Sequence, residues 1–320
     1  MHAPLITVIA LCYNHAGFLV ECLDSIAAQT HADFQLIVTD DASKDNSATL
    51  IEQWLAAHRP DATFIRHERN RGICTTLNEA LAEAKGQYIS MIATDDRWTP
   101  DKLGTQLLFA LAQAPDAAVI YSDAEIMNEQ GQCLGRRFIA DHRPELAPPS
   151  GNIFSALVDG NFMPAMATLI RLDALRQVGG YDESLSYEDY DMWLRLSGAG
   201  HSFAYCPQVL AHYRTVSTSM TNSLFIRPTA AHSRTVIEIH NRWFDSGLLS
   251  GPQARKFGAK ISDAAYNLFV LDDPQAARYL RLAARCAKSP RIFTLACAAT
   301  LGIKRTQAAG FMKKLGLRSD

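Results

Sequence analysis

The stretch that most limits the fold of this chain runs from Gln87 to Asp96 and reads QYISMIATDD. Its apolar part, Tyr88 to Thr94, leads without interruption into two adjacent carboxylates, and Arg97-Trp98-Thr99-Pro100 then breaks the run and begins a helix. This pattern predicts a central strand, buried on both faces, that brings Asp95 and Asp96 to the carboxyl edge of a parallel sheet. Open α/β sheets bind their ligands at that edge.

Neighbouring carboxylates repel each other unless a cation lies beside them, so a divalent metal is a natural partner for Asp95 and Asp96. Mg²⁺ and Mn²⁺ take oxygen ligands and are commonly completed by phosphate oxygens, which points to a nucleoside diphosphate. The alternative is that the pair only caps the helix that follows. Both interpretations stay open on this stretch alone.

The first hundred residues alternate between apolar strand patterns and amphipathic helix patterns. This alternation predicts right-handed crossovers and a parallel sheet flanked by helices. Predicted strands cover residues 5–11, 34–38, 63–66 and 88–94, and predicted helices cover 16–29, the segment from 45 or 46 on, and 75–84. Further along the chain, residues 201–205 and 209–213 are predicted as two short strands.

Polar residues follow the carboxyl ends of these strands, where a nucleotide would bind. Tyr13 is suited to stack on a base. Asp40 is suited to accept a hydrogen bond from an imide N–H, which uracil, thymine and guanine offer and adenine and cytosine do not. Asp95 and Asp96 are suited to ribose and metal. Neither GxGxxG nor GxxxxGK[ST] occurs, so the usual dinucleotide fold and the P-loop are not supported.

Four segments, in this order and spacing, resemble the family 2 glycosyltransferases of the GT-A fold: VIALCYN, VTDDASKDNS, ERNRGICTTLNEALAEAKGQYISMIATDD and GGYDESLSYEDYDMWLRL. The resemblance implies a Rossmann-like mixed sheet flanked by helices, with a C-terminal helical extension. It places a catalytic domain at residues 1–225, with a nucleotide-binding half (1–125) and an acceptor half (126–225). Residues 226–320 form the helical region.

The resemblance also implies roles for individual residues. Asp40 binds the nucleotide base with Tyr13 beside it, and Asp96 binds the metal with Asp95 as its neighbour on ribose or metal. The predicted donor-binding set is completed by Asn14, Asp41, Arg71 and Arg214. The implied cation is Mn²⁺ or Mg²⁺, and the donor is a UDP-sugar, with dTDP and GDP as alternatives.

The sequence departs from the commonest family pattern at two positions. Ala93 stands where an Asp usually precedes the acidic pair, which leaves it less certain which carboxylate touches the metal. Val216 stands where the family has a metal-binding His after Tyr-Arg. His212 would replace that ligand only if the strand register shifts, and otherwise it is an ordinary strand-end histidine. For Arg214, a structural salt bridge is as well supported as a diphosphate contact.

A second pair of carboxylates, Glu188 and Asp189, lies in the first turn of a helix predicted from Tyr187 to Leu196. The helix dipole alone favours acids there. The resemblance instead assigns Asp189 as the general base on an acceptor hydroxyl, with Glu188 as its orienting neighbour. This arrangement implies a single displacement with inversion at the anomeric carbon.

Composition bears on the compartment and on the partners. The seven cysteines are scattered without a CxxC pair, as in a reducing compartment, and neither a signal peptide nor a bilayer-spanning run is indicated, so we expect a cytoplasmic protein. From Ala254 to Asp320 there are 13 Lys and Arg against 4 Asp and Glu. This basic end is compatible with peripheral contact with an anionic membrane, and packing of the C-terminal helices against the catalytic domain is the alternative.

The sequence thus predicts metal-dependent, inverting transfer of a sugar to a glycan or lipid-linked glycan in surface polysaccharide synthesis, without a nucleic-acid partner. The acceptor class rests on the resemblance alone. A sugar-phosphate nucleotidyltransferase is one alternative, but residues 5–20 contain only Gly17 and no Lys or Arg to hold a triphosphate. A non-catalytic nucleotide-sugar-binding protein is the other, suggested by Ala93 and Val216.

Overall fold

The computed structural model describes residues 5–216, 229–287 and 289–303. The chain divides into two compact units, one formed by residues 1–183 and 188–216 and the other by residues 184–187 and 217–320. The predicted domain boundary at residue 225 lies outside the described residues.

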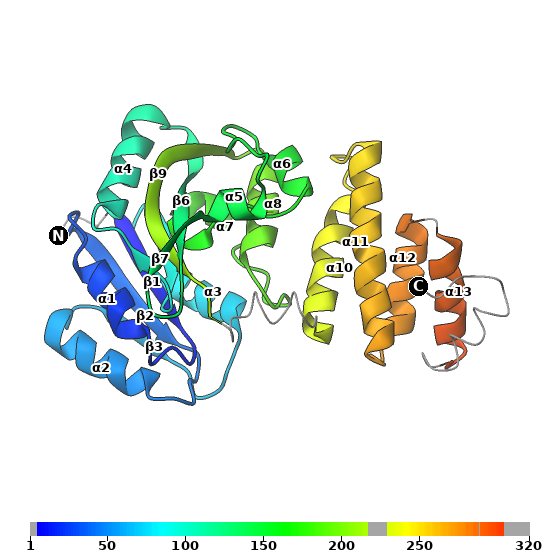
Figure 1. Cartoon of the computed structure of the whole chain (residues 1–320), viewed down its shortest axis with the longest axis horizontal. Helices are drawn as coiled ribbons and strands as arrows, with labels where there is room; N and C mark the ends of the chain where they lie inside the picture. Colours follow the sequence, from blue (N-terminus) through cyan, green and yellow to red (C-terminus); the bar gives the residue numbers. More distant parts are fainter. Residues whose placement is uncertain (1–4, 217–228, 288, 304–320) are drawn as a thin grey trace. The chain divides into compact units, whose positions relative to one another are not determined.

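The first unit is built on a nine-stranded sheet within the described residues, with the order β3-β2-β1-β4-β8-β6-β9-β5 and with β7 paired to β6. Strands β1 to β4 pair in parallel, whereas β5, β7 and β8 run antiparallel to their partners (Figure 1). The strands are β1 (Ile6–Cys12), β2 (Phe34–Asp40), β3 (Thr63–Arg66), β4 (Tyr88–Ala93), β5 (Arg97–Trp98), β6 (Ala117–Met127), β7 (Cys133–Arg137), β8 (Thr168–Arg171) and β9 (Ser202–Arg214).

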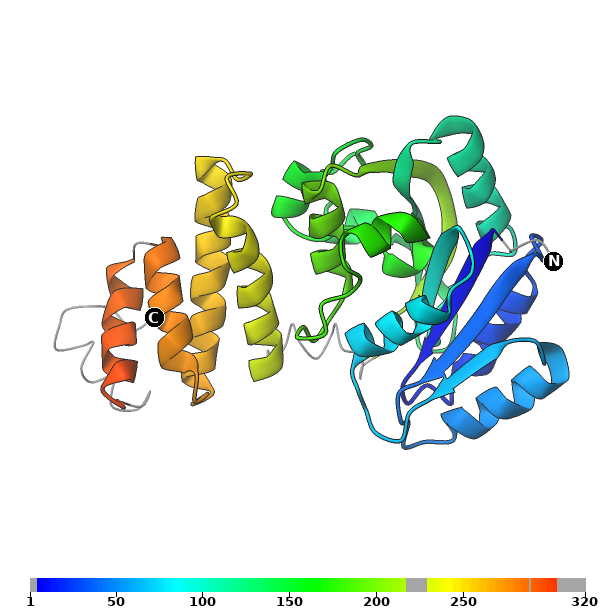
Figure 2. The same ribbon diagram turned by 180° about the vertical axis from the view of Figure 1, so that it is seen from behind.

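Helices cover both faces of this sheet. The crossovers β1–α1–β2 and β2–α2–β3 run in one direction and β3–α3–β4 returns, so right-handed connections put α3 on the opposite face from α1 and α2 (Figures 1 and 2). The helices are α1 (Leu19–Ala27), α2 (Ser47–His58), α3 (Ile73–Glu83), α4 (Lys102–Gln113), α5 (Phe138–His142), α6 (Phe154–Val158), α7 (Leu172–Gln177) and α8 (Asp189–Gly198), with a 3₁₀ turn at Ala165–Ala167.

The opening stretch of the sequence analysis forms the centre of the sheet. Strand β4 lies between β1 and β8, and Ile89 and Ile92 are almost completely buried on its two faces. Gly86 precedes it because a Cβ there would lie 2.5 Å from the backbone nitrogen of Thr7. The prediction of a central, doubly buried strand is confirmed.

The prediction was wrong in two places. Arg97-Trp98, expected to break the strand and open a helix, forms β5 and pairs with β9, and α4 begins only at Lys102. A two-residue strand has no periodicity to detect. Residues 201–205 and 209–213, expected as two strands, belong to the single strand β9, because Pro207 is accommodated where the register against β6 shifts.

The second unit contains α10 (Ala230–Phe244), α11 (Gly251–Val270), α12 (Ala276–Ala287) and α13 (Pro290–Thr300). Their apolar faces pack on one another around Ile261, Leu268, Leu280 and Leu295. These side chains therefore need no other surface to bury them. No described helix combines the length and apolar character needed to cross a bilayer.

Candidate functional site

Strand β4 ends at the acidic pair. Asp96 is 3% exposed and accepts a hydrogen bond at Oδ1 from the backbone N–H of Arg214 over 2.8 Å. Burial, and next the charge of Asp95, raises the pKa of Asp96 well above its usual value. Asp95 Oδ2 lies 3.8 Å from Nε2 of His15, whose Nδ1 is 3.0 Å from Thr94 Oγ1. The two carboxylates are thus held together with little protein charge to offset them, which suits a divalent cation.

Asp40 ends β2 beside Cys12 of β1 and is 1% exposed. Its Oδ2 accepts a hydrogen bond from the backbone N–H of Ser43 over 3.1 Å, whereas its Oδ1 is buried without a hydrogen-bond partner in the described part of the chain. A buried carboxylate oxygen left unpaired is costly unless a ligand pairs with it. Tyr13, next along from Cys12, is 41% exposed and available for stacking.

Asn14 holds the loop that contains Tyr13. It adopts a left-handed backbone with φ 57°, a region that Asn tolerates better than most residues. Its backbone N–H donates to Ser43 Oγ over 2.8 Å, and its Oδ1 accepts from the backbone N–H of Lys44 over 2.7 Å. The side-chain oxygen of Asn14 therefore joins the loops after β1 and β2, and its predicted contact with the donor stays a prediction.

Asp41 is buried and fixes the loop after β3. Its Oδ1 accepts from the backbone N–H of Arg71 over 2.7 Å, and its Oδ2 accepts from the backbone N–H of Gly72 over 2.9 Å. His67 bridges Asp41 and Glu79, at 2.8 Å from Nδ1 and 2.6 Å from Nε2, and Glu79 also pairs with the Arg71 guanidinium. Asp41 and Arg71 were both predicted to bind the donor. In the structure, both carboxylate oxygens of Asp41 accept hydrogen bonds from the loop that carries Arg71, so Asp41 positions Arg71.

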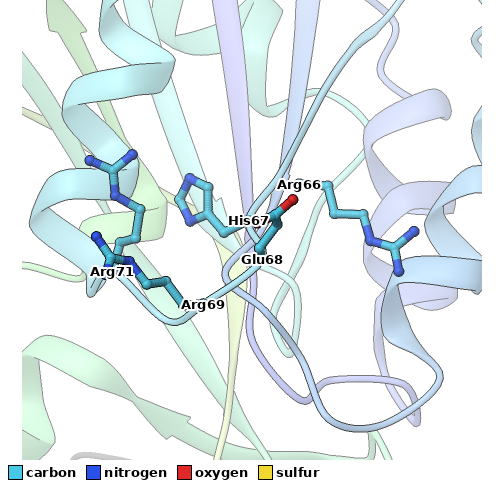
Figure 3. A pocket seen from close by; sticks show the side chains of 5 residues that line it. All are labelled: Arg66, His67, Glu68, Arg69 and Arg71. Carbon is cyan, nitrogen blue, oxygen red and sulfur yellow. The ribbon is translucent and has the colours of Figure 1, made fainter.

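The loop carrying Arg71 borders a cavity of about 570 Å³ (Figure 3). Arg69 and Arg71 lie on one side of it and Arg66 on the other. Arg66 pairs with Glu52 over 2.9 Å. The lining side chains are Arg66, His67, Glu68, Arg69 and Arg71, so the cavity has the positive charge that a phosphorylated ligand requires.

The second acidic pair begins α8, with Glu188 as its N-cap and Asp189 in its first turn. Asp189 Oδ2 accepts from Asn161 Nδ2 over 2.6 Å, and Oδ1 accepts from the backbone N–H of Tyr190 over 2.6 Å. Burial raises the pKa of Asp189, although these two hydrogen bonds oppose the shift. Burial, and next the charge of Asp189, raises the pKa of Glu188 to about 8.

The turn before α8 is fixed to α3. Asn78 Oδ1 accepts from the backbone N–H of Tyr181 over 2.8 Å, and its Nδ2 donates to the Tyr181 carbonyl over 2.9 Å. Gly180 has φ +70°, and a Cβ there would lie 2.8 Å from Asn78 Oδ1. At the start of α3, burial and then the Glu188 carboxylate raise the pKa of the Cys74 thiol to about 12. Glu188 thus faces the helix that follows directly on Arg71 and Gly72.

Arg214, predicted to contact a diphosphate, is buried in protein contacts. Its Nε donates to the Asp95 carbonyl over 2.6 Å, Nη1 to the Glu129 carbonyl over 2.9 Å, and Nη2 pairs with Glu21 over 2.5 Å. All three guanidinium nitrogens are engaged, so the geometry favours the salt-bridge alternative. Arg97 shares Glu21 at 2.6 Å.

His212 makes its contacts away from the acidic pair Asp95 and Asp96. It is in register with Arg97 on β5 and with Glu125 on β6, and a ring nitrogen lies within 4.8 Å of both Glu125 and Cys133. Within the described part of the chain, no hydrogen bond or ion pair joins it to Asp95 or Asp96, so its predicted role at that metal site gains no support from this geometry.

Sequence reasoning missed His67, Glu79, Asn161 and Glu21. Asn161 is 28 residues from Asp189, and Glu21 is 193 residues from Arg214. No local pattern links such pairs. His67 and Glu79 are closer in sequence to the Arg71 loop. The order of Asp41, His67 and Glu79 around that loop, as acid, base and acid, was the only sequence signal of this network.

The sequence and the fold both have counterparts among known proteins. A sequence profile described as glycosyl transferase family 2 matches residues 7–178. The chain belongs to glycosyl transferase family 2. An uncharacterized glycosyltransferase of Rickettsia felis is 28% identical over 199 residues, which cover 61% of this family member but only 32% of the relative. A putative teichuronic acid biosynthesis glycosyltransferase of Bacillus subtilis is 25% identical over 221 residues, covering 69% and 82% of the two chains.

Solved structures resemble this family 2 member in fold. S. aureus TarS in complex with UDP-GlcNAc gives a TM-score of 0.64 at 16% identity and covers 98% of this chain and 93% of that one. Mannosyltransferase PcManGT of Pyrobaculum calidifontis, with GDP-Man and Mn²⁺, gives 0.59 at 19% identity, covering 96% and 83%. The predicted GT-A architecture is confirmed.

Proposed function

We propose that this protein transfers a sugar from a nucleoside diphosphate sugar to a hydroxyl group, with inversion at the anomeric carbon. The observation that carries the proposal is the geometry of Asp189. One of its oxygens is fixed by Asn161, and burial raises its pKa toward the range useful for a general base. A base of this kind accepts the proton of the attacking hydroxyl, and one displacement follows.

Donor binding is assigned to the edge where β1, β2 and β4 end. The unpaired Oδ1 of Asp40 is suited to accept an imide N–H, which favours a UDP-, dTDP- or GDP-sugar, and Tyr13 is suited to lie against the base. Arg71, held by the network through Asp41, supplies positive charge toward the phosphates.

Metal dependence is part of the proposal. The acidic pair Asp95 and Asp96 fits Mn²⁺ or Mg²⁺, because a cation offsets the burial and the charge of Asp95 that raise the pKa of Asp96. When bound, such a cation neutralises the charge of the leaving diphosphate. We expect Asp96→Asn to abolish Mn²⁺-dependent donor binding in a thermal-shift assay, and unchanged binding would contradict the assignment.

The deciding experiment uses Asp189→Asn. A panel of UDP-, dTDP- and GDP-sugars with Mn²⁺ is screened by thermal shift, and the best donor is assayed for slow release of nucleoside diphosphate in water. We expect the variant to bind this donor as the wild type does and to lose turnover by roughly 100-fold or more. Full turnover in the variant would refute the role of Asp189.

The same assay addresses the alternatives. A non-catalytic binding protein would bind the donor and release nothing in the wild type. A nucleotidyltransferase would instead consume a nucleoside triphosphate with a sugar phosphate and release pyrophosphate. Family membership favours the transferase over both.

For the acceptor, we propose a growing glycan of a surface polysaccharide, supported by the similarity to the putative teichuronic acid biosynthesis glycosyltransferase of B. subtilis. A lipid-linked acceptor would bring the protein to an anionic membrane, to which the basic C-terminal region is suited. Liposome sedimentation with and without the residues after Gly251 tests this contact. Equal recovery of both forms would remove the membrane proposal.

A further inference from the structure

A group of three side chains outside the proposed donor site carries a further inference. Glu125 on β6, Cys133 on β7 and His212 on β9 each offer one ligand atom, and these atoms lie within 4.8 Å of one another. Glu125 and His212 are direct register partners, and Cys133 is paired with Met127, two residues beyond Glu125. The pairing of β7 with β6 shifts register between Ile126 and Met127, and this irregular pairing, together with the register of β6 and β9, brings the three side chains together.

The environment of the group suits a metal better than a purely structural contact. Nδ1 of His212 is buried without a hydrogen-bond partner among the described residues. Cys133 is an exposed free thiol, accessible to an ion from solvent.

Arg97 lies beside this group, with its charge partly offset by Glu21. Arg97 Nη1 lies 2.6 Å from Glu21, while Nη2 donates toward Cys133 Sγ over 3.8 Å. An N–H group pointing at a ligating sulfur is the kind of second contact that orients metal-bound thiolates.

We propose that Glu125, Cys133 and His212 form a Zn²⁺ site, separate from the Mn²⁺ or Mg²⁺ site assigned to Asp95 and Asp96. Thiolate and imidazole select Zn²⁺ over Mg²⁺ and Mn²⁺, and three protein ligands leave one tetrahedral position for water. The three ligand atoms need only move closer together to reach the separations found in a tetrahedral Zn²⁺ site. The exposed side chain of Cys133 can make this movement. Bound Zn²⁺ would link β7 to β9 at His212. This position is two residues before Arg214, whose backbone N–H donates to Asp96.

The test uses the full-length protein, stripped with a chelator, at pH 7 and without nucleotide. The exposed thiols Cys133 and Cys297 are alkylated with iodoacetamide, and each is followed by peptide mass spectrometry. We expect equimolar Zn²⁺ to slow alkylation of Cys133 by about tenfold or more and to leave Cys297, the internal control, unchanged. Equal rates at Cys133 with and without Zn²⁺ would overturn the proposal.

Variants and a spectroscopic probe make the assignment specific. We expect Co²⁺ to give a thiolate charge-transfer band that is lost in Cys133→Ser and retained in Cys297→Ser. His212→Asn and Glu125→Gln should each weaken Zn²⁺ protection about tenfold or more. Protection that persists in both variants would overturn the site. Asp96→Asn should keep Zn²⁺ protection, so this result stands whether or not the proposed transfer reaction is found.

Discussion

Asn161 donates a hydrogen bond to Oδ2 of Asp189 over 2.6 Å, although 28 residues separate them in sequence. This bond stabilises the charged form of the proposed base and opposes the upward pKa shift caused by burial.

Replacing Asn161 by Ala should therefore raise the pKa of Asp189 further. Because the base acts deprotonated, the acid side of the pH–rate profile should move to higher pH, and turnover near pH 6 should fall more than turnover near pH 9. The profile of donor hydrolysis against pH measures this. Asn152→Ala is the matched control, since Asn152 also bonds α8 but at the Ser197 carbonyl, over 3.1 Å. An unshifted pH–rate profile in Asn161→Ala would show that Asn161 does not position Asp189.

The Glu188 carboxyl should make the protein less stable as pH rises. Its pKa is raised to about 8, so the folded state binds more protons than the unfolded state between the ordinary value of 4.5 and about 8. That contribution is favourable below 4.5 and is lost on the way to 8. Gln at position 188 cannot ionise. The melting temperature of Glu188→Gln relative to the wild type should therefore rise between pH 4.5 and about 8 and stay constant above that range. A constant difference between pH 5 and pH 9, without metal or nucleotide, would contradict the prediction.

Asp40→Asn should weaken binding of uracil nucleotides. The amide oxygen of Asn would take over the hydrogen bond from the Ser43 N–H, which turns the NH₂ group toward the ligand's imide N–H and sets donor against donor. We expect the Kd for UDP with Mn²⁺ to rise by about tenfold or more in calorimetry. Asp61→Asn, at an exposed carboxylate paired with Arg59, serves as control. Unchanged UDP affinity in Asp40→Asn would argue against base recognition by this residue.

Arg214→Met tests the two interpretations of this arginine. If the guanidinium is structural, its loss leaves the Asp95 and Glu129 carbonyls and Glu21 without their partner. The free energy of unfolding in urea should then fall by about 2–3 kcal/mol. Arg59→Met, which removes a more exposed pair, should cost less. A variant of normal stability that binds UDP weakly would instead assign Arg214 to the diphosphate.

The sequence by itself determined the parallel strands β1 to β4 and the place of the acidic pair Asp95 and Asp96 directly after β4. The run from Gln87 to Asp96 and the strand–helix alternation are local signals, because burial of a strand on both faces and of one helix face is written into consecutive residues. They were enough to predict the central place of β4, whereas the family was identified from the resemblance of four ordered segments.

The tertiary structure decided what each polar group contacts. The sequence left open whether His212 joins Asp96 and whether Arg214 contacts a diphosphate, and in the structure β9 carries His212 to Glu125 and Cys133 and Arg214 to Glu21. It could not show that Asp41 positions Arg71 or that Asn161 holds Asp189. Strand pairing and long side chains join residues far apart along the chain, and the free energy of those contacts depends on register and burial, which no local pattern records.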